Sequence, residues 1–416
     1  MYKVGEFGKT LIKFATSQAF SNLLRVISGF LVISLIDPEL YGNYSGVGVF
    51  LGYILLGHGG IINGLSRELP YELGKGNDEY ARQMASSVFV LSIWISVFSS
   101  LVFLLFSLYY FIVGEYLFAL IFLSYVIIAG LYLLNSQYLP VLYRTNNDFN
   151  SLSKQNIFVG IGNLASVALV YYFSIYGLMA RGVFLAVYQF FLLYKNKPYK
   201  ITFEFQWEHY KKLLKTGIPI FIVGQINPLW ATILNSIIFS VGGAVNFGLY
   251  ALSTIVNSTV GVIPTSFSGV IYPRMNIMYG QGKSISYILK SHLKPMFFQF
   301  GVMMIIALIG VFLLPVAVPL LIPKYIDGIE AAQWMLFSPV MLSFGVLNNI
   351  YNVVKKQQLY FLSILIGVFI GSAYILLQLY FNGFNLVFFP QGMIIGKFLQ
   401  QGLSLFFIYK FLIDDQ

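Results

Sequence analysis

Twelve stretches of mostly apolar residues constrain the fold of this chain more than any other feature of its sequence. They lie at 9–36, 43–65, 82–113, 116–139, 150–173, 176–194, 214–241, 245–271, 288–322, 331–354, 357–380 and 386–408. A helix needs about 20 such residues to cross a bilayer. Only 10% of the 416 residues are charged, whereas a soluble domain carries roughly 25%. The sequence therefore predicts an all-α integral membrane protein with twelve transmembrane helices.

Lysine and arginine fall on one side of the predicted membrane. Of the 25 basic residues, 21 lie at the inner side, Lys324 lies in an outer loop, and Arg25, Arg181 and Lys397 fall inside spans. Because cytoplasmic loops hold the excess of basic residues, both termini are predicted to be cytoplasmic. We expect the first stretch to be a retained helix, since no cleavage site of small residues follows it. The net charge of +10 suggests lipid headgroups as partners and not nucleic acid.

The sequence repeats itself at an offset of 206 residues, which is close to half of the chain. Tyr41-Gly-Asn-Tyr44 recurs as Phe247-Gly-Leu-Tyr250, and 31–34 recurs as 237–240. An even number of spans in each half keeps its orientation, so the halves are predicted to be parallel repeats with a substrate site between them. We therefore expect an N-terminal six-helix lobe at 1–194, an interfacial cytoplasmic linker at 195–213 and a C-terminal six-helix lobe at 214–416, around a central cavity.

Polar side chains gather on one half of the first span. At 100° per residue, that half carries Lys13, Ser17, Gln18, Ser21, Asn22, Arg25 and Ser28. A helix that lines a water-filled cavity sorts its side chains in this way, whereas a helix in lipid has no reason to do so. We therefore expect this face to line a substrate cavity. The alternative for Arg25 is a structural pairing with another helix or with backbone carbonyls.

Two further basic residues inside spans are candidates for the same cavity. Lys397 shares a polar stripe of the last span with Gln400, Gln401 and Ser404, and a structural ion pair or snorkelling to the cytoplasmic side is the alternative. Arg181 lies about five residues from the outer end of its span, where snorkelling competes with a role in the cavity. No Asp or Glu lies deep in any span, which argues against proton or sodium coupling through a carboxylate.

Patterns for catalysis or metal binding are not recognisable. The chain has no cysteine, and His58, His209 and His292 lack the spacing of metal ligands. No metal, other cofactor or catalytic residue is predicted. A lone histidine such as His58 is commonly held by structural contacts, although coupling through it stays open. The outer loops are short and their acidic residues are scattered, so an integral-membrane glycosyltransferase or polymerase is disfavoured and the chain is not expected to be an enzyme.

Four short motifs carry a resemblance to a known family. Asp37-Pro-Glu-Leu-Tyr-Gly-Asn-Tyr-Ser45 follows the first span, and Leu214-Lys-Thr-Gly-Ile-Pro219, Phe247-Gly-Leu-Tyr-Ala251 and Tyr272-Pro-Arg274 lie in the second half. With the twelve-span layout, they resemble the polysaccharide-transporter branch of the multidrug/oligosaccharidyl-lipid/polysaccharide (MOP) exporter superfamily. Within it, the Wzx-type O-antigen oligosaccharide flippases are the most similar group.

The resemblance implies a function and a set of partners. Its members flip undecaprenyl-diphosphate-linked oligosaccharides from the cytoplasmic to the periplasmic leaflet of the bacterial inner membrane by alternating access. The implied partners are this lipid-linked oligosaccharide, membrane lipids, and the polysaccharide polymerase and chain-length machinery. O-antigen, capsule and exopolysaccharide units stay open as substrates. A cavity with Arg25 and Lys397 would attract the diphosphate. The alternative is a secondary multidrug or other antiporter of the same superfamily, although amphiphilic cations should avoid a positive cavity.

The predicted topology can be tested with a reporter. We expect a periplasm-active reporter fused after Gln416 to give no signal, because the inner loops hold nearly all basic residues. A strong signal from the fusion, at an expression level equal to that of a cytoplasm-active reporter, would contradict the twelve-span topology.

Overall fold

The structure is a computed structural model that describes residues 4–354 and 356–413. The side chains of 4–12, 15, 269, 270, 273, 276, 412 and 413 are not part of that description. Lys3, Lys355 and both chain ends, which entered the predicted topology, lie outside the described residues. The described residues form helices joined by short connections and contain no strand. Since lipid offers no hydrogen-bond partner to the backbone, so apolar a chain satisfies its amides within helices.

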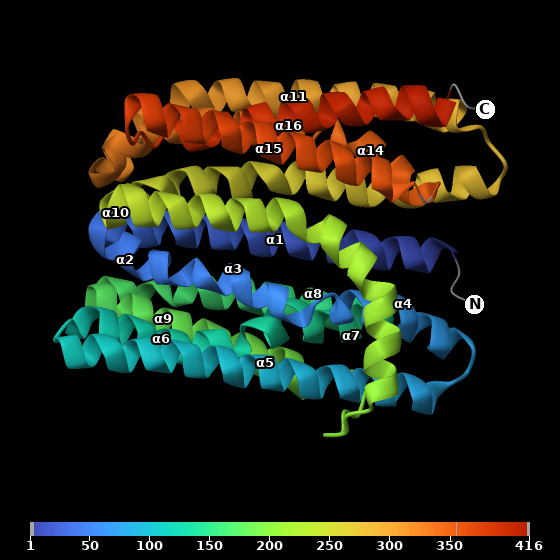
Figure 1. Ribbon diagram of the computed structural model, residues 1–416, viewed down its shortest axis with the longest axis horizontal. Coiled ribbons are helices and arrows are strands. Elements are labelled where there is room, and N and C mark those ends of the chain that lie inside the picture. The colour runs from blue at the N-terminus through green and yellow to red at the C-terminus, as the bar shows by residue number, and fades with distance from the viewer. Residues whose placement is uncertain (1–3, 355, 414–416) are drawn as a thin grey trace. The chain divides into compact units, whose positions relative to one another are not determined.

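The first half of the chain contains nine α-helices among its described residues. They are α1 (Val4–Leu35), α2 (Pro38–Gly48), α3 (Phe50–Ile54), α4 (Ile61–Gly74), α5 (Asp78–Val113), α6 (Tyr116–Leu133), α7 (Leu139–Thr145), α8 (Phe149–Ala165) and α9 (Val167–Lys195). A 3₁₀ turn, η1 (Leu55–His58), precedes α4, and a π-helical turn, η2 (Leu134–Tyr138), joins α6 to α7. Figure 1 shows α5, α6 and α9 side by side, and α1 packs along α8.

The second half continues with longer helices. They are α10 (Trp207–Gly280), α11 (Ile285–Leu321), α12 (Ile329–Met335), α13 (Phe337–Met341), α14 (Gly345–Val353), α15 (Gln357–Asn382) and α16 (Phe388–Ile408). A 3₁₀ turn, η3 (Pro323–Gly328), follows α11, and a π-helical turn, η4 (Tyr409–Ile413), follows α16. Helices α15 and α16 form a close antiparallel pair (Figure 1).

The helices account for the twelve predicted spans. Among the described residues, eight helical stretches are long and apolar enough to cross a membrane, and the bent pair Pro38–His58 and Ile61–Gly74 makes a ninth. One of the eight, Trp207–Ser268, contains two predicted spans that meet at Gly243, where the backbone leaves the helical conformation. The other two predicted spans are the short α8, continued by the start of α9, and the more polar α16. The predicted all-α fold with twelve transmembrane helices in two lobes is confirmed.

Contacts divide the chain into two compact units at positions that the sequence does not mark. The first unit is Met1–Ile36 and Asn43–Thr232, and the second is Asp37–Gly42 and Ile233–Gln416. The sequence places the boundary in the linker 195–213, whereas this division falls inside α10. A physical reason is a close crossing of α10 over α4, where a Cβ on Gly217 would overlap the carbonyl oxygen of Gly60. This crossing ties the start of α10 to the first unit.

A second glycine crossing, within the second unit, joins equivalent positions of the repeat. A Cβ on Gly42 would overlap the carbonyl oxygen of Ala244, and a Cβ on Gly248 would overlap that of Pro38. Both the glycines and the residues they face are related by the offset of 206 residues. The two halves therefore contribute matching contacts to this crossing, and such backbone contact requires residues without a side chain.

This crossing predicts a large effect for a small substitution. We expect Gly248→Ala to lower the free energy of unfolding by about 1–3 kcal/mol, because the added methyl group must displace backbone. The measurement is the thermal unfolding midpoint of the purified protein in detergent. Gly261→Ala is the matched control, since a Cβ at this helical position has no neighbour within 4 Å among the described residues. Equal midpoints for the two variants would show that the crossing is looser than the structure has it.

Candidate functional site

The first unit contains a polar cavity between four helical segments. Its volume is about 760 Å³, which is within the usual range for a small-molecule site. The lining comes from α1 (Phe14, Gln18, Arg25), from η2 and α7 (Asn135, Ser136, Pro140, Arg144), from α8 (Leu152, Gln155, Asn156, Val159, Asn163) and from α9 (Leu185, Gln189, Leu193). None of these lining residues is acidic.

Helix geometry sets the depth of the two arginines in this cavity. Arg144 lies next to the inner end of α7, at Thr145. Asn156 is seven residues into α8 and donates to the Oε1 of Gln18 at 2.7 Å, so these two side chains share one level. Arg25 is seven residues further along α1. At 1.5 Å per residue, Arg25 therefore lies about 20 Å deeper than the inner end of the helices.

Amide side chains on the cavity wall are oriented by the backbone of neighbouring helices. Asn135 donates to the carbonyl oxygen of Ala186 at 2.8 Å, and Gln155 donates to that of Leu192 at 3.2 Å. Gln189 donates to the carbonyl oxygen of Asn135 at 3.3 Å. Asn135 and Ser136 belong to η2, and such a π-helical turn is frequent at functional sites. These hydrogen bonds to the backbone hold the amide side chains in fixed positions on the cavity wall.

The two arginines keep donor groups available to a ligand. Arg144 donates from Nε to the carbonyl oxygen of Pro140 at 3.3 Å, and its side chain is otherwise exposed. Arg25 is exposed to the cavity, and no hydrogen bond or ion pair holds it within the described residues. A planar guanidinium can hold a phosphate by two parallel hydrogen bonds. The cavity thus combines two phosphate-binding groups with a neutral polar wall.

The structure separates the residues that the first span presents on its polar half. Arg25 and Gln18 line the cavity, whereas Lys13 and Ser17 line a smaller pocket of about 280 Å³ with Lys154 of α8. Ser21 is buried where α1 crosses Gly160, and Asn22 is half-buried outside both linings. The structure therefore brings only part of the predicted set to one place.

Arg181 and Lys397 lie in other surroundings. Arg181 donates to the Oγ of Ser28 at 2.8 Å and to the Oδ1 of Asn163 at 3.3 Å, so it links α9 to α1 and α8 beside the cavity. Lys397 belongs to the second unit and donates to the Oγ of Ser338, which in turn donates to Asn257. The role of Lys397 in substrate binding stays a prediction.

Most residues of the cavity wall are not predicted from the sequence. Arg144 was counted among the inner basic residues, and the polar residues of α8 were not noticed. A helical signal was present, because Leu152, Gln155, Asn156, Val159 and Asn163 follow the spacing of one helix face. Together with the seven-residue spacing of Gln18 and Arg25, this pattern would have indicated that the first and fifth spans share a polar surface.

His58, which the sequence left open, is held by neighbouring groups. Its side chain is buried, and its Nδ1 accepts a hydrogen bond from the backbone of Gly60 at 3.1 Å. The ring packs edge-on against Phe221, with 4.9 Å between ring centroids. These contacts agree with a structural role at the bend between η1 and α4. The described residues contain no group of three or more acidic or histidine side chains that could hold a metal ion.

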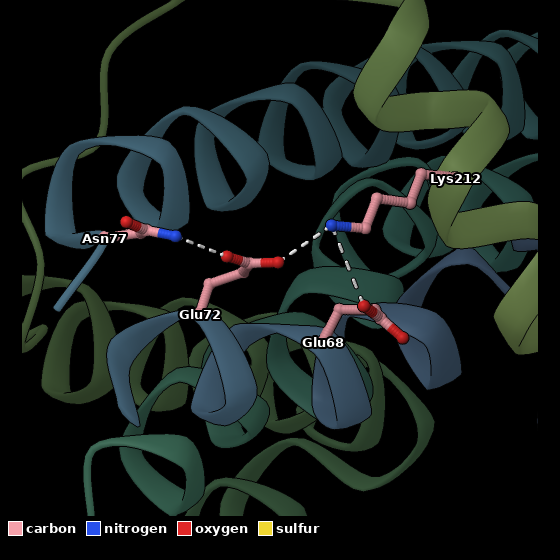
Figure 2. Close-up of polar contacts among 4 residues, drawn as sticks. All are labelled: Glu68, Glu72, Asn77 and Lys212. Atoms are coloured by element: carbon pink, nitrogen blue, oxygen red, sulfur yellow. Dashed lines mark hydrogen bonds and ion pairs between the residues drawn. The ribbon is translucent and has the colours of Figure 1, made fainter. Parts of the chain in front are cut away.

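A second polar cluster joins the last turns of α4 to the first turns of α10 (Figure 2). Lys212, near the start of α10, is 2.8 Å from Glu72 and 3.8 Å from Glu68 on α4, and Asn77 donates to the other oxygen of Glu72 at 2.9 Å. The Lys212 ammonium and then Asn77 lower the pKa of Glu72, and Glu72 raises the pKa of Lys212. This cluster has complementary charges and anchors α10 to α4.

Comparison with solved structures identifies the fold. The inward-facing conformation of a multidrug-resistance MATE transporter of the MOP superfamily has a TM-score of 0.72 and 15% identity, covering 94% of this chain and 93% of its own. An outward-facing MATE transporter of that superfamily has a TM-score of 0.59 and 16% identity, covering 96% and 94%. A MATE transporter from Vibrio cholerae has a TM-score of 0.60 and 14% identity, covering 98% and 97%. The protein therefore has the fold of the MOP-superfamily transporters.

Sequence comparison identifies the family. The model of the family described as polysaccharide biosynthesis protein matches residues 73–319, which is more than half of the chain. The chain belongs to this family of polysaccharide biosynthesis proteins. No curated protein matches it in sequence. The resemblance to polysaccharide transporters, drawn from short motifs, is thereby confirmed at the level of this family, and the fold agrees with it.

The ion pair of Figure 2 predicts a dependence of stability on pH. Because the pKa of Glu72 is lowered below its ordinary value of 4.5 in the folded protein, its stabilisation is present above that value and is lost as the pH falls below it. We expect Glu72→Gln to lower the free energy of unfolding by about 1 kcal/mol at pH 7, because solvent screens this ion pair, and to reduce the loss of stability between pH 6 and 3. The measurement is the unfolding midpoint in detergent.

Glu79→Gln is the matched control for this prediction. Glu79 is exposed, and within the described part of the chain its carboxylate accepts a single long hydrogen bond of 3.4 Å, from Gln83. If both variants give the pH profile of the unaltered protein, the ion pair contributes nothing to stability.

Proposed function

We propose that this protein flips undecaprenyl-diphosphate-linked oligosaccharides from the cytoplasmic to the periplasmic leaflet of the bacterial inner membrane, for assembly of O-antigen or a related surface polysaccharide. The observation that carries the proposal is the cavity with Arg25, Arg144 and a wall of amides, in a chain of a polysaccharide biosynthesis family. The substrate unites an anionic diphosphate with a glycan rich in hydroxyl groups, and the cavity offers complementary groups for both.

The two arginines have different tasks in this proposal. Arg144, at the inner end of the cavity, lies at the level where the diphosphate of a lipid in the cytoplasmic leaflet begins its movement. Arg25, about 20 Å deeper, holds the diphosphate while it is away from bulk water. Both residues bind phosphate oxygens through paired hydrogen bonds. Alternating access then requires that the outward state binds more weakly, so that the substrate is released.

The neutral groups between the arginines bind the glycan. The amide pair of Gln18 and Asn156 leaves a donor on one side chain and an acceptor on the other for sugar hydroxyls. Gln189 presents its carbonyl oxygen from the facing helix, since its amide nitrogen is bonded to backbone. Such a site binds many hydroxylated ligands with modest strength, which suits a transporter that must also release them.

The proposed location and partners follow from this substrate. The protein lies in the inner membrane with both termini in the cytoplasm, and it delivers the repeat unit to a polysaccharide polymerase and chain-length machinery. No step of bond making or breaking is proposed, and purified protein is expected to transfer no sugar.

A secondary multidrug antiporter is the second candidate function. The observation in its favour is the fold, because the similar solved structures include multidrug-resistance transporters. The two arginines oppose it for cationic drugs, since a cavity with positive walls repels them. Drug susceptibility of the same cells that are assayed for surface glycan distinguishes the two functions.

Substitution of the cavity arginines tests the proposal. In a strain that depends on this gene for surface glycan, we expect Arg25→Ala to reduce the glycan about 10- to 100-fold, because a charge-assisted contact is worth about 1.5–3 kcal/mol. Arg144→Ala should have a similar or smaller effect, and Arg25→Lys should retain part of the activity since charge survives without the planar fork. Lys397→Ala should be milder. Surface glycan is measured at matched protein levels.

Lys154→Ala is the matched control, because it removes one positive charge from α8 outside the cavity. Normal surface glycan in the Arg25, Arg144 and Lys397 variants would refute the cationic mechanism. If deletion of the gene from its native strain lowers drug resistance and leaves the surface glycan unchanged, the protein is assigned to multidrug export instead.

A further inference from the structure

Three cations of the second unit, near the connection from α10 to α11, have no acidic partner within the described residues. Arg274 lies near the end of α10, and Lys290 and Lys294 lie near the start of α11. All three side chains are exposed, and no hydrogen bond or ion pair to them occurs in the part of the chain that the structure describes. The sequence from 209 to 326 contains no Asp or Glu. An anion for these groups must therefore come from outside this segment.

In the first unit, a basic residue near a corresponding helix end does have acidic partners. There Lys212 is bonded to Glu72 and lies near Glu68 (Figure 2), and further acidic residues follow at Asp78 and Glu79. Retention of basic residues in cytoplasmic loops accounts for the lysines and arginines of both units. It does not account for the absence of Asp and Glu between 209 and 326, because acidic residues contribute little to orientation.

An apolar pocket of about 500 Å³ lies beside these cations, entirely within the second unit. Phe267, Ile271, Arg274, Ile277 and Met278 of α10 and Ser291, His292 and Pro295 of α11 line it. The Oγ of Ser291 and the Nδ1 of His292 both bond to the carbonyl oxygen of Ile288. Arg274 is thus the charged group on an otherwise apolar wall.

The lysines of α11 extend this cationic edge. Lys290 and Lys294 are four residues apart and share one face of the helix. The pocket-lining Ser291 and Pro295 share the neighbouring face, one residue further along. The arrangement places Arg274 in the wall of an apolar pocket and the two lysines on the adjacent face of α11. An amphiphile with an anionic headgroup matches both parts, whereas free phosphate would leave the apolar wall uncovered.

We propose that this pocket binds one anionic phospholipid of the cytoplasmic leaflet. Its acyl chain lies against Phe267, Ile271 and Ile277, and its phosphate accepts hydrogen bonds from Arg274 and is attracted by Lys290 and Lys294. The lipid neutralises the inner end of the second unit as Glu72 neutralises Lys212 in the first. The site is separate from the cavity of the first unit, and its occupancy does not depend on the proposed transport function.

Lipid retention by the purified full-length protein tests this proposal. The probes are phosphatidylglycerol and phosphatidylcholine with identical acyl chains, added to delipidated protein and counted by native mass spectrometry. We expect the unaltered protein to retain phosphatidylglycerol in preference to phosphatidylcholine. The triple variant Arg274→Gln, Lys290→Gln, Lys294→Gln should lose about tenfold in affinity for phosphatidylglycerol and should not change toward phosphatidylcholine.

A matched control and a second variant separate charge from shape. Lys195→Gln, Lys197→Gln, Lys211→Gln removes three positive charges from the first unit, where these lysines lie over aromatic rings, and should keep the preference. Ile277→Trp adds bulk at an exposed position of the pocket wall and should reduce retention of phosphatidylglycerol with all charges intact. All substituted residues are on the surface or over rings, so the variants are expected to fold.

Three results would overturn the proposal. The first is equal retention of the two phospholipids by the unaltered protein. The second is the same loss in the control variant as in the triple variant, which would indicate a general charge effect. The third is displacement of phosphatidylglycerol by an equimolar polyprenyl diphosphate, which would assign the pocket to a lipid-linked substrate.

Discussion

The cost of holding a cation inside a membrane shapes the polar interior of this protein. An unpaired charge at the centre of a spanning helix costs about 2.5–3.5 kcal/mol on insertion scales. The three intramembrane cations meet this cost in different ways. Arg181 is bonded to Ser28 and Asn163, and Lys397 is bonded to Ser338. Arg25 has no hydrogen bond or ion pair within the described residues, and it lies instead at a cavity of about 760 Å³. Amide side chains of α8 and α9 line the same cavity, and polar walls of this kind lower the cost of a charge inside a membrane.

The sequence predicts which face of a helix is polar more reliably than it predicts which other helices pack against that face. Periodicity identifies the polar half of α1, and Arg25 and Gln18 on that half do line a cavity. It cannot say where another helix will pack on the same half. Here α8 packs along it through Gly160, which buries Ser21 and leaves Lys13 and Ser17 on the far side. The position of Arg144 in the wall is not apparent from the sequence, because a basic residue at a helix end is already explained by membrane topology.

Contacts between segments far apart in the chain cannot be predicted from the sequence either, because they too depend on how the helices pack. The bond between Lys212 and Glu72 joins residues 140 positions apart, and neither residue stands out from the charges around it. The division inside α10 depends on Gly217 reaching the backbone of Gly60, which only the folded helices bring about. The internal repeat, in contrast, can be detected from the sequence, because it requires only that residue types match at a fixed offset. It gave the equivalence of Gly42 and Gly248, and the structure adds that these glycines share one crossing.

Charge balance differs between the two units although membrane topology imposes the same rule on both. Orientation requires an excess of basic residues at the inner end, and the first unit achieves it with acidic residues present, so that Lys212 can be neutralised by Glu72. The second unit has the excess without acidic residues from 209 to 326. Selection for topology alone would tolerate carboxylates there. Their absence leaves Arg274 available to an external anion, and the apolar residues beside it favour an anion that carries a hydrocarbon chain. In the two proposals together, the protein would meet anionic amphiphiles at two places, in a polar cavity suited to release and at an apolar pocket suited to retention.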